Sequence, residues 1–123
     1  MERIEEFTKD NKDFIHLDFS GFRTCEEFEE LTEQAKSVIA NYSKSSLFAI
    51  VNISDVRLNS CIKSVFLDFI HCNAPYIRYS AIIGIDGIKK MMTETVIKQS
   101  TRKNFLFAFT KDQAIELIQR NNY

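Results

Sequence analysis

Near the middle of the chain runs Leu47-Phe48-Ala49-Ile50-Val51-Asn52-Ile53, an almost continuously apolar stretch that ends at Ser54-Asp55. Such a stretch is typical of a central strand that is covered on both faces of its sheet. Three further short apolar runs share this length and character: Phe14–Phe19, Ile77–Gly84 and Phe105–Phe109. Each of the four runs is followed by a segment with helical spacing. This alternation predicts a largely parallel sheet covered by helices.

The segments between the runs carry signals for turns and helix ends. Lys9-Asp10-Asn11-Lys12 predicts a hairpin turn between a first weak strand, Ile4–Thr8, and the first apolar run. Thr24 and Glu27 have the spacing of a capping box, so a helix is expected to begin there. We therefore predict a single α/β domain over residues 1–123, with a mixed, mostly parallel sheet of four to five strands and four helices.

Three more helices are expected along the chain. The second begins near Asn59 or Ser60, either of which can be its N-cap, and stops before Pro75 because proline disfavours helix at the preceding residue. The third runs from about Gly87 to about Ser100. The last begins at Thr110, where Gln113 completes a second capping box.

The composition excludes several classes of protein. No apolar run approaches the ~20 residues that span a bilayer, so no integral membrane segment is expected. The acidic start lacks the regions of a signal peptide. Cys25, Cys61 and Cys72 form no closely spaced pair, which favours reduced thiols in a cytoplasmic protein over a disulfide framework.

The charges are unevenly distributed along the chain. Residues 1–33 hold eleven acidic and four basic residues (net −7), and residues 34–123 hold six acidic and twelve basic residues (net +6). Two solvated, complementary faces explain this pattern, and a face that docks a charged partner is the alternative. The pI of about 6.1 argues against a nucleic-acid binder.

Polar residues gather where the predicted strands end. The working surface of a parallel sheet lies at the carboxyl ends of its strands, which makes these residues and the helix starts that follow them the candidate binding face. The face comprises Asp18, Ser20, Asp55, Asn59, Gly84, Asp86, Gly87, Lys89, Lys90 and Met91. Met91 has three possible roles: contact with the core, part of a dimer interface, or part of a lipid-contacting surface.

Chemical motifs are weak or missing. No histidine or cysteine pair has zinc-ligand spacing, and we expect no metal and no cofactor. Cys61 near a helix start has either a lowered pKa or the role of a small semi-buried filler. Asp18, Asp55 and Asp86 can gather along one rim for acid/base or Mg²⁺ chemistry, but turn formation explains aspartate at these positions better.

Two segments carry a family resemblance: Ile15-His16-Leu17-Asp18-Phe19-Ser20-Gly21 and Asn73-Ala74-Pro75-Tyr76-Ile77-Arg78-Tyr79-Ser80-Ala81-Ile82-Ile83-Gly84. They resemble bacterial STAS-like proteins, whose domain is shared by sulfate transporters and anti-sigma-factor antagonists. The closer likeness is to an uncharacterised branch that is grouped with STAS/SEC14-type domains. Gly84-Ile85-Asp86-Gly87-Ile88-Lys89-Lys90 and Phe109-Thr110-Lys111-Asp112-Gln113-Ala114 also suit that branch.

The resemblance implies a regulatory or binding role without catalysis. Antagonists of the best-known type carry Asp-Ser-Ser-Gly at the start of the second helix, where one serine is phosphorylated. The nearest match here is Asn59-Ser60-Cys61-Ile62, which lacks both Asp and Gly. Ser60 is therefore either a phosphorylated switch residue or part of the helix cap.

Three functions follow as alternatives. The first is a non-enzymatic cytoplasmic module that binds a protein partner or a second copy of itself. The second is a carrier of a small apolar or lipid ligand, suggested by the eleven phenylalanines and the SEC14-type association. An internal cavity of ~300 Å³ or more favours this carrier. The third is an enzyme that uses Asp18, Asp55 and Asp86.

Overall fold

The fold is built from five strands and three helices in the described part of the chain. The structure is a computed structural model, and it describes residues 2–57, 59–84 and 104–120. The elements are β1 (Ile4–Lys9), β2 (Lys12–Asp18), α1 (Cys25–Ile39), β3 (Leu47–Asn52), α2 (Ser60–Asn73), β4 (Ile77–Ile83), β5 (Phe105–Ala108) and α4 (Lys111–Arg120). The third helix expected from about Gly87 to Ser100 lies outside the described residues.

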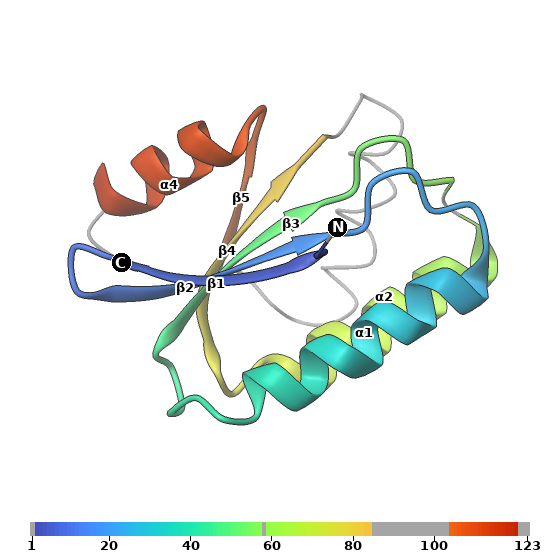
Figure 1. The fold of residues 1–123 in the computed structure, drawn as a ribbon, viewed down its shortest axis with the longest axis horizontal. Helices are drawn as coiled ribbons and strands as arrows, with labels where there is room; N and C mark the ends of the chain where they lie inside the picture. The colour runs from blue at the N-terminus through green and yellow to red at the C-terminus, as the bar shows by residue number, and fades with distance from the viewer. Residues whose placement is uncertain (1, 58, 85–103, 121–123) are drawn as a thin grey trace.

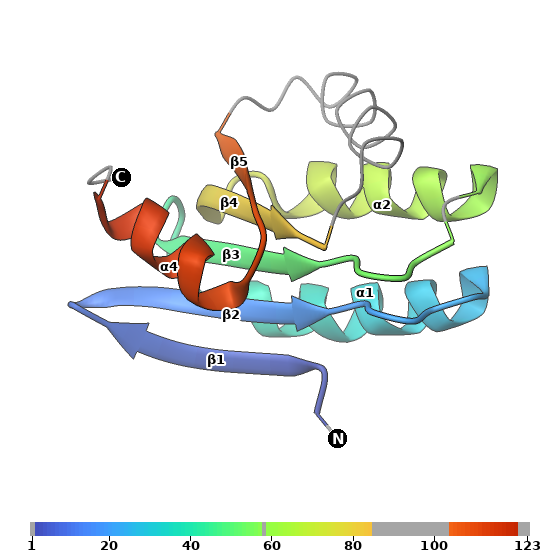
Figure 2. The same cartoon turned by 90° about the horizontal axis from the view of Figure 1, so that it is seen from above.

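The strands form one mixed sheet in the order β1-β2-β3-β4-β5 (Figure 2). β1 is antiparallel to β2, whereas the pairs β2–β3, β3–β4 and β4–β5 are parallel. The central strand is β3, and five of its six residues are buried, as its continuous apolar sequence predicts. The predicted fold class is therefore confirmed.

The helices cover both faces of the sheet. α1 and α2 lie side by side on one face, and α4 lies on the other (Figure 1). Alternation along β2 sends Ile15 and Leu17 into the core under α1 and α2, and it sends Phe14 into the smaller core under α4. Among the described residues, no helix is long and apolar enough to cross a membrane.

The helix starts follow the predicted capping signals. The Thr24 hydroxyl accepts from the Glu27 backbone N–H (3.2 Å) and the Glu27 carboxylate accepts from the Thr24 N–H (3.0 Å). The backbone N–H groups of Arg23 and Thr24 both donate to this carboxylate and hold the pKa of Glu27 below its usual value. At α4 the Thr110 hydroxyl accepts from the Gln113 N–H (3.1 Å), but the Gln113 side chain accepts from the Phe109 N–H (2.6 Å) and not from that of Thr110. α2 ends at Asn73, before Pro75, as expected.

The first hairpin and the last helix are in direct contact. Asp10 and Asn11 both have positive φ (52° and 64°), as a two-residue turn of the primed type between β1 and β2 requires. The Gln119 side chain donates to Asp10 (2.5 Å), and Lys111 forms an ion pair with Glu5. α4 therefore joins the C-terminal part of the described chain to its first two strands.

Candidate functional site

The carboxyl ends of β2 and β3 carry the same side-chain turn. The Asp18 carboxylate accepts from the Ser20 N–H (2.9 Å), and the Asn52 side-chain oxygen accepts from the Ser54 N–H (2.9 Å). Asp18 and Asn52 lie opposite each other in the parallel register. Aspartate and asparagine are favoured here because their side chains replace a backbone acceptor in a turn. The two strands therefore end in matched turns at one edge.

Backbone hydrogen bonds join these turns to each other. The Phe19 N–H donates to the Asn52 carbonyl (2.9 Å), and the Gly21 N–H donates to the Ser54 carbonyl (2.9 Å). Gly84, at the end of β4, packs against Ser54 with φ +83°. These contacts hold Asp18, Ser20 and Gly84 of the candidate binding face at one continuous edge of the sheet.

Asp18 is occupied by structural contacts. Arg3 donates from Nη1 to the carbonyl oxygens of Asp18 (3.0 Å) and Ser20 (2.9 Å), and the same nitrogen lies 3.9 Å from the Asp18 carboxylate. The guanidinium stacks 4.3 Å above the Phe22 ring. Only 14% of the Asp18 side chain is exposed. Its carboxylate therefore accepts the hydrogen bond of the turn and balances the positive charge of Arg3.

Asp55 lies on the same edge but is arranged differently. It is exposed, has φ +61°, and accepts at its backbone carbonyl from the Arg23 side chain. Asp86, the third carboxylate of the enzyme hypothesis, lies outside the described residues. Within residues 2–57, 59–84 and 104–120, neither Asp18 nor Asp55 belongs to a group of three metal-binding side chains.

The start of α2 resolves which residue is the cap. The Asn59 side-chain oxygen accepts from the Ile62 N–H (2.9 Å), so Asn59 is the N-cap. Ser60 is the first helical residue and is exposed. Its hydroxyl is therefore presented to solvent at a helix N-terminus, where backbone N–H groups favour a negative charge.

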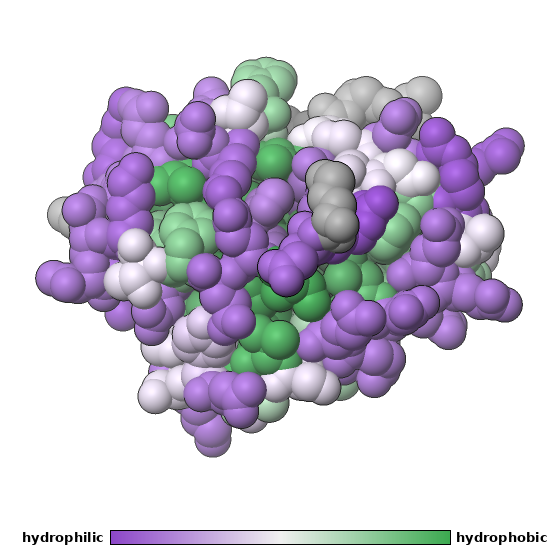
Figure 3. All heavy atoms as spheres, viewed as in Figure 1, coloured by the Kyte–Doolittle hydropathy of each residue, from purple (hydrophilic) through white to green (hydrophobic). Residues whose placement is uncertain are grey.

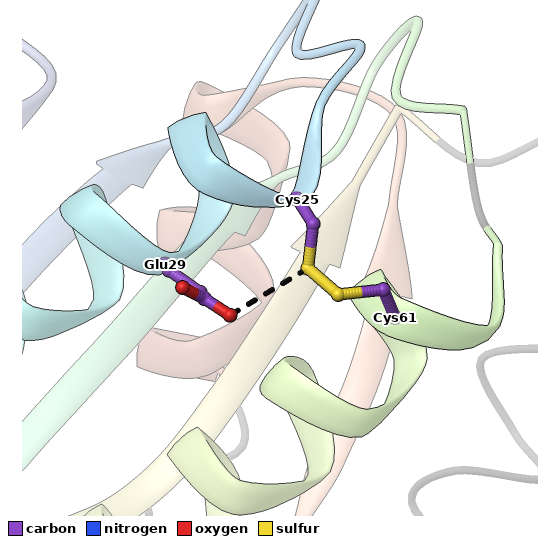
Figure 4. Close-up of side chains that lie close together, drawn as sticks. All are labelled: Cys25, Glu29 and Cys61. Atoms are coloured by element: carbon purple, nitrogen blue, oxygen red, sulfur yellow. Dashed lines mark hydrogen bonds between the residues drawn. A yellow bond between two sulfur atoms is a disulfide. The ribbon is translucent and has the colours of Figure 1, made fainter.

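Cys25 and Cys61 form a disulfide between the first turns of α1 and α2 (Figure 4). The prediction of reduced thiols is therefore wrong for this pair, and Cys61 is exposed rather than a semi-buried filler. Only Cys72 is free among the cysteines. The Cys25 Sγ also lies 3.7 Å from a Glu29 carboxylate oxygen, one turn along α1.

A signal for this pair was present in the sequence. Cys25 directly follows the N-cap Thr24, and Cys61 lies two residues after the N-cap Asn59. Helices that follow neighbouring parallel strands on one face begin at the same edge of the sheet. Their first turns are therefore neighbours, although 36 positions separate the cysteines in the chain.

An open groove of about 690 Å³ lies between β1 and α1, and it contains much of the N-terminal acidic excess. Figure 3 shows hydrophobic atoms within it and hydrophilic atoms along its margins. Its lining includes Ile4, Leu31 and Val38 together with four glutamates: Glu2, Glu6, Glu27 and Glu30. Arg3 and Phe22 also line it, so the groove adjoins the edge that carries Asp18.

One wall of this groove is held by a tyrosine. The Tyr42 hydroxyl donates to a Glu6 carboxylate oxygen (2.6 Å) and so links the loop after α1 to β1. Burial, together with this hydrogen bond, raises the pKa of Tyr42 to about 12.

The interior offers little space in the described part of the chain. An apolar cavity between α2 and the sheet, lined by Phe66, Phe69, Ile82 and their neighbours, has a volume of about 40 Å³. Small-molecule sites occupy roughly 300–1,000 Å³. This cavity is therefore too small for the ligand of the carrier hypothesis.

His16 is a half-buried titratable group of the sheet. It lies on the α4 face of β2 between Phe14 and Asp18, and its Nε2 is buried without a hydrogen-bond partner. Burial and the nearby Lys111 charge lower the pKa of His16, while Asp18 and Glu5 oppose that shift. The group belongs to the packing under α4.

Five residues of the candidate binding face lie outside the described residues: Asp86, Gly87, Lys89, Lys90 and Met91. The described members fall into two places: the strand ends hold Asp18, Ser20, Asp55 and Gly84, and the start of α2 holds Asn59, which precedes the possible switch residue Ser60. Sequence reasoning missed Arg3 and Ser54, which hold the first of these places together.

Comparison with known proteins identifies the fold. No family model matches the sequence, and no curated protein matches it either. A solved structure from Shewanella loihica, described as an uncharacterized protein of the DUF3478 family with a SpoIIAA-like fold, is similar with a TM-score of 0.70. The match covers 93% of this chain and 90% of that one at 16% sequence identity. The STAS-like arrangement expected from the sequence is thereby confirmed, and this chain has a SpoIIAA-like fold.

Proposed function

We propose that this chain is a non-catalytic regulatory module that binds another protein through the start of α2 and the adjoining edge of the sheet. The observation that carries the proposal is the division of roles between Asn59 and Ser60. Asn59 caps the helix, which leaves the Ser60 hydroxyl exposed and free to be modified. The SpoIIAA-like fold supports a role of this kind.

Ser60 is the proposed switch residue. A phosphate on its hydroxyl adds close to two negative charges and would lie beside the unpaired N–H groups of the first turn of α2. The charge is favoured there by the helix dipole, so the helix start itself tolerates it. A partner that contacts this turn closely would meet a new charge and a larger group, and its affinity would fall.

The edge formed by the strand ends supports binding over catalysis. The Asp18 carboxylate is engaged by the Ser20 N–H and by Arg3, which leaves it poorly placed to exchange a proton with a substrate. The neighbouring edge is stiffened by hydrogen bonds between adjacent turns. A rigid surface binds a partner with little loss of conformational entropy.

The acidic groove between β1 and α1 suggests the chemistry of the partner. Its glutamates surround the apolar side chains of Ile4, Leu31 and Val38. A partner segment with basic side chains and one or two apolar anchors complements this arrangement in charge and shape. The second candidate partner is another copy of this chain, which would bind the groove through its more basic residues 34–123. Sedimentation of the purified chain distinguishes self-association from binding of a different protein.

The test compares two serine substitutions at opposite ends of the sheet. Ser60→Glu mimics the charge of the phosphate, and Ser43→Glu places the same charge in the exposed loop between α1 and β3. Partners are captured from the source host by cross-linking and their affinities measured with purified proteins. We expect Ser60→Glu to weaken binding about 10-fold or more, equivalent to ~1.4 kcal/mol, and Ser43→Glu to bind like the wild type.

Equal affinity of the wild type and Ser60→Glu would contradict the proposal. Native mass spectrometry of the chain from its source host provides a second test. A covalent mass gain of one phosphate on Ser60 supports the switch, whereas a small molecule that is retained under native conditions and lost on denaturation supports the carrier hypothesis instead.

A further inference from the structure

The first turns of α1 and α2 bring together three side chains that bind metals. Cys25, Glu29 and Cys61 each offer one ligand atom, and these atoms all lie within 4.8 Å of one another. Figure 4 shows the Glu29 carboxylate directed toward the two sulfur atoms. The site lies at the surface, with Glu29 and Cys61 exposed and Cys25 half-buried. A metal ion can therefore reach it from solvent.

The positions of the two helices allow tetrahedral coordination once the disulfide is reduced. With Zn–S bonds of ~2.3 Å and Zn–O bonds of ~2.0–2.2 Å, neighbouring ligand atoms in a tetrahedron lie roughly 3.5–3.8 Å apart. The Cys25 Sγ and the Glu29 oxygen are already 3.7 Å apart. The Cα atoms of Cys25 and Cys61 are 6.0 Å apart. Small side-chain rotations therefore bring two reduced sulfurs to the required separation without moving either helix.

The electrostatic setting favours the thiolates that a metal needs. Cys25 is the first residue of α1 and Cys61 the second residue of α2, so the positive ends of two helix dipoles point at the sulfurs. We propose that the reduced protein binds one Zn²⁺ ion through the Cys25 and Cys61 thiolates and a Glu29 carboxylate oxygen. The disulfide is the oxidised form of the same site, which does not bind the metal, and in the zinc-bound form the fourth position is open to water. This proposal does not rest on the proposed function.

The two states are connected by a balanced reaction. A phosphine reductant breaks the S–S bond by a two-electron reduction, takes the oxygen of one water molecule to become a phosphine oxide, and leaves two thiols. Binding of Zn²⁺ then displaces the two thiol protons. Hydrogen peroxide then oxidises the two thiolates to the disulfide by a two-electron step, takes up two protons to become two water molecules, and Zn²⁺ is released.

The chain contains its own control for this site. Cys72 and Asp68 on α2 are also a thiol and a carboxylate four residues apart, with the sulfur 4.0 Å from both carboxylate oxygens. No second thiol adjoins that pair among the described residues. Cys72→Ser therefore removes an exposed cysteine of similar local chemistry without touching the proposed site.

The test uses the full chain, reduced with a phosphine and freed of reductant without oxygen. Zn²⁺ is titrated in competition with a chromophoric chelator, and Co²⁺ serves as the spectroscopic probe of thiolate ligation. We expect one equivalent of Zn²⁺ and intense thiolate-to-Co²⁺ absorption in the wild type and in Cys72→Ser. Loss of an outer-shell partner costs about 10–100-fold in metal affinity, so loss of a ligand should cost roughly 100-fold or more for Cys25→Ser and Cys61→Ser. Glu29→Gln should lose ~10-fold, since an amide oxygen is the weaker ligand.

Two results would overturn the proposal. One is a reduced wild type that takes up no Zn²⁺ although alkylation shows all three thiols to be free. The other is a Cys25→Ser or Cys61→Ser variant that is folded by circular dichroism and binds Zn²⁺ as tightly as the wild type. Neither result depends on partner binding, so failure here is separable from failure of the proposed function.

Discussion

Gly84 leaves no room for a side chain beside Ser54, because a Cβ built on Gly84 would lie 1.9 Å from the Ser54 Oγ and 2.6 Å from its backbone nitrogen. The contact joins the end of β4 to the turn that follows β3. The Gly84 φ of +83° also lies in the left-handed region that disfavours side chains. Two separate penalties therefore act at this position.

Gly84→Ala is expected to lower the free energy of unfolding by about 2–5 kcal/mol, from backbone strain of ~1–2 kcal/mol and overpacking of ~1–3 kcal/mol. Gly21 is the matched control, because its φ is +77° but no heavy atom lies within 4 Å of its built Cβ. Gly21→Ala should lower the free energy of unfolding only by the backbone strain of ~1–2 kcal/mol. Urea unfolding measures both variants, and equal losses would show that the Ser54 contact is unimportant.

The Cys25–Cys61 disulfide is expected to stabilise the metal-free protein. It closes a loop of 36 positions, for which the chain-entropy estimate is about 4 kcal/mol. Cys25→Ser should lower the free energy of unfolding by roughly 2–4 kcal/mol in the presence of a chelator and without reductant. Cys72→Ser should change it little. Addition of a reductant to the wild type should remove the difference from Cys25→Ser, and a wild type that is insensitive to reductant would contradict the prediction.

Stability should fall in mild acid because of His16. Burial lowers its pKa in the folded protein, so between the usual histidine value of 6.5 and the lower folded value the unfolded chain binds the proton and the folded chain does not. The contribution of neutral His16 to the free energy of unfolding is fully present above pH 6.5 and is lost as the pH falls through the pKa of His16 in the folded protein. Urea midpoints measured across this range should decline in the wild type and decline less in His16→Gln. A His16→Gln variant with the same slope as the wild type would assign the effect to other groups.

Asn59 and Ser60 should differ in their effect on stability. The Asn59 side chain satisfies the Ile62 N–H at the start of α2. Asn59→Ala should therefore lower the free energy of unfolding by about 1 kcal/mol, whereas Ser60→Ala should stay within about 0.5 kcal/mol. Thermal and urea unfolding provide the comparison. A larger loss for Ser60→Ala would assign its hydroxyl a structural role and weaken its interpretation as a switch.

Most of the fold follows from local sequence patterns. The apolar run at Leu47–Ile53 predicts a central strand, and Thr24 with Glu27 predicts the first turn of α1, because burial and capping act within a few residues. The end of α2 before Pro75 follows from the covalent structure of proline. These effects need no knowledge of the tertiary structure.

The site was harder to predict because its contacts are distant in the chain. Asp18 was correctly interpreted as a turn residue, but its contact with Arg3 depends on the pairing of β1 with β2. The Cys25–Cys61 bond depends on α1 and α2 lying side by side. Spacing rules for cysteines apply to pairs that are close in the sequence. They therefore give no signal for Cys25 and Cys61, which only the sheet topology brings together.

The strand order also determines how the sheet can be assembled. Because the order in the sheet is the order in the chain, each new strand can add to an edge that has already been made. Folding can thus proceed from the N-terminus during synthesis, because each parallel strand pairs with the strand that precedes it in the chain, across one connecting segment. α4 is the exception, since its contacts with Glu5 and Asp10 join the two ends of the described chain. A nascent chain without α4 would display the apolar side chains of Phe14 and Ile50 until that helix emerges from the ribosome and covers them.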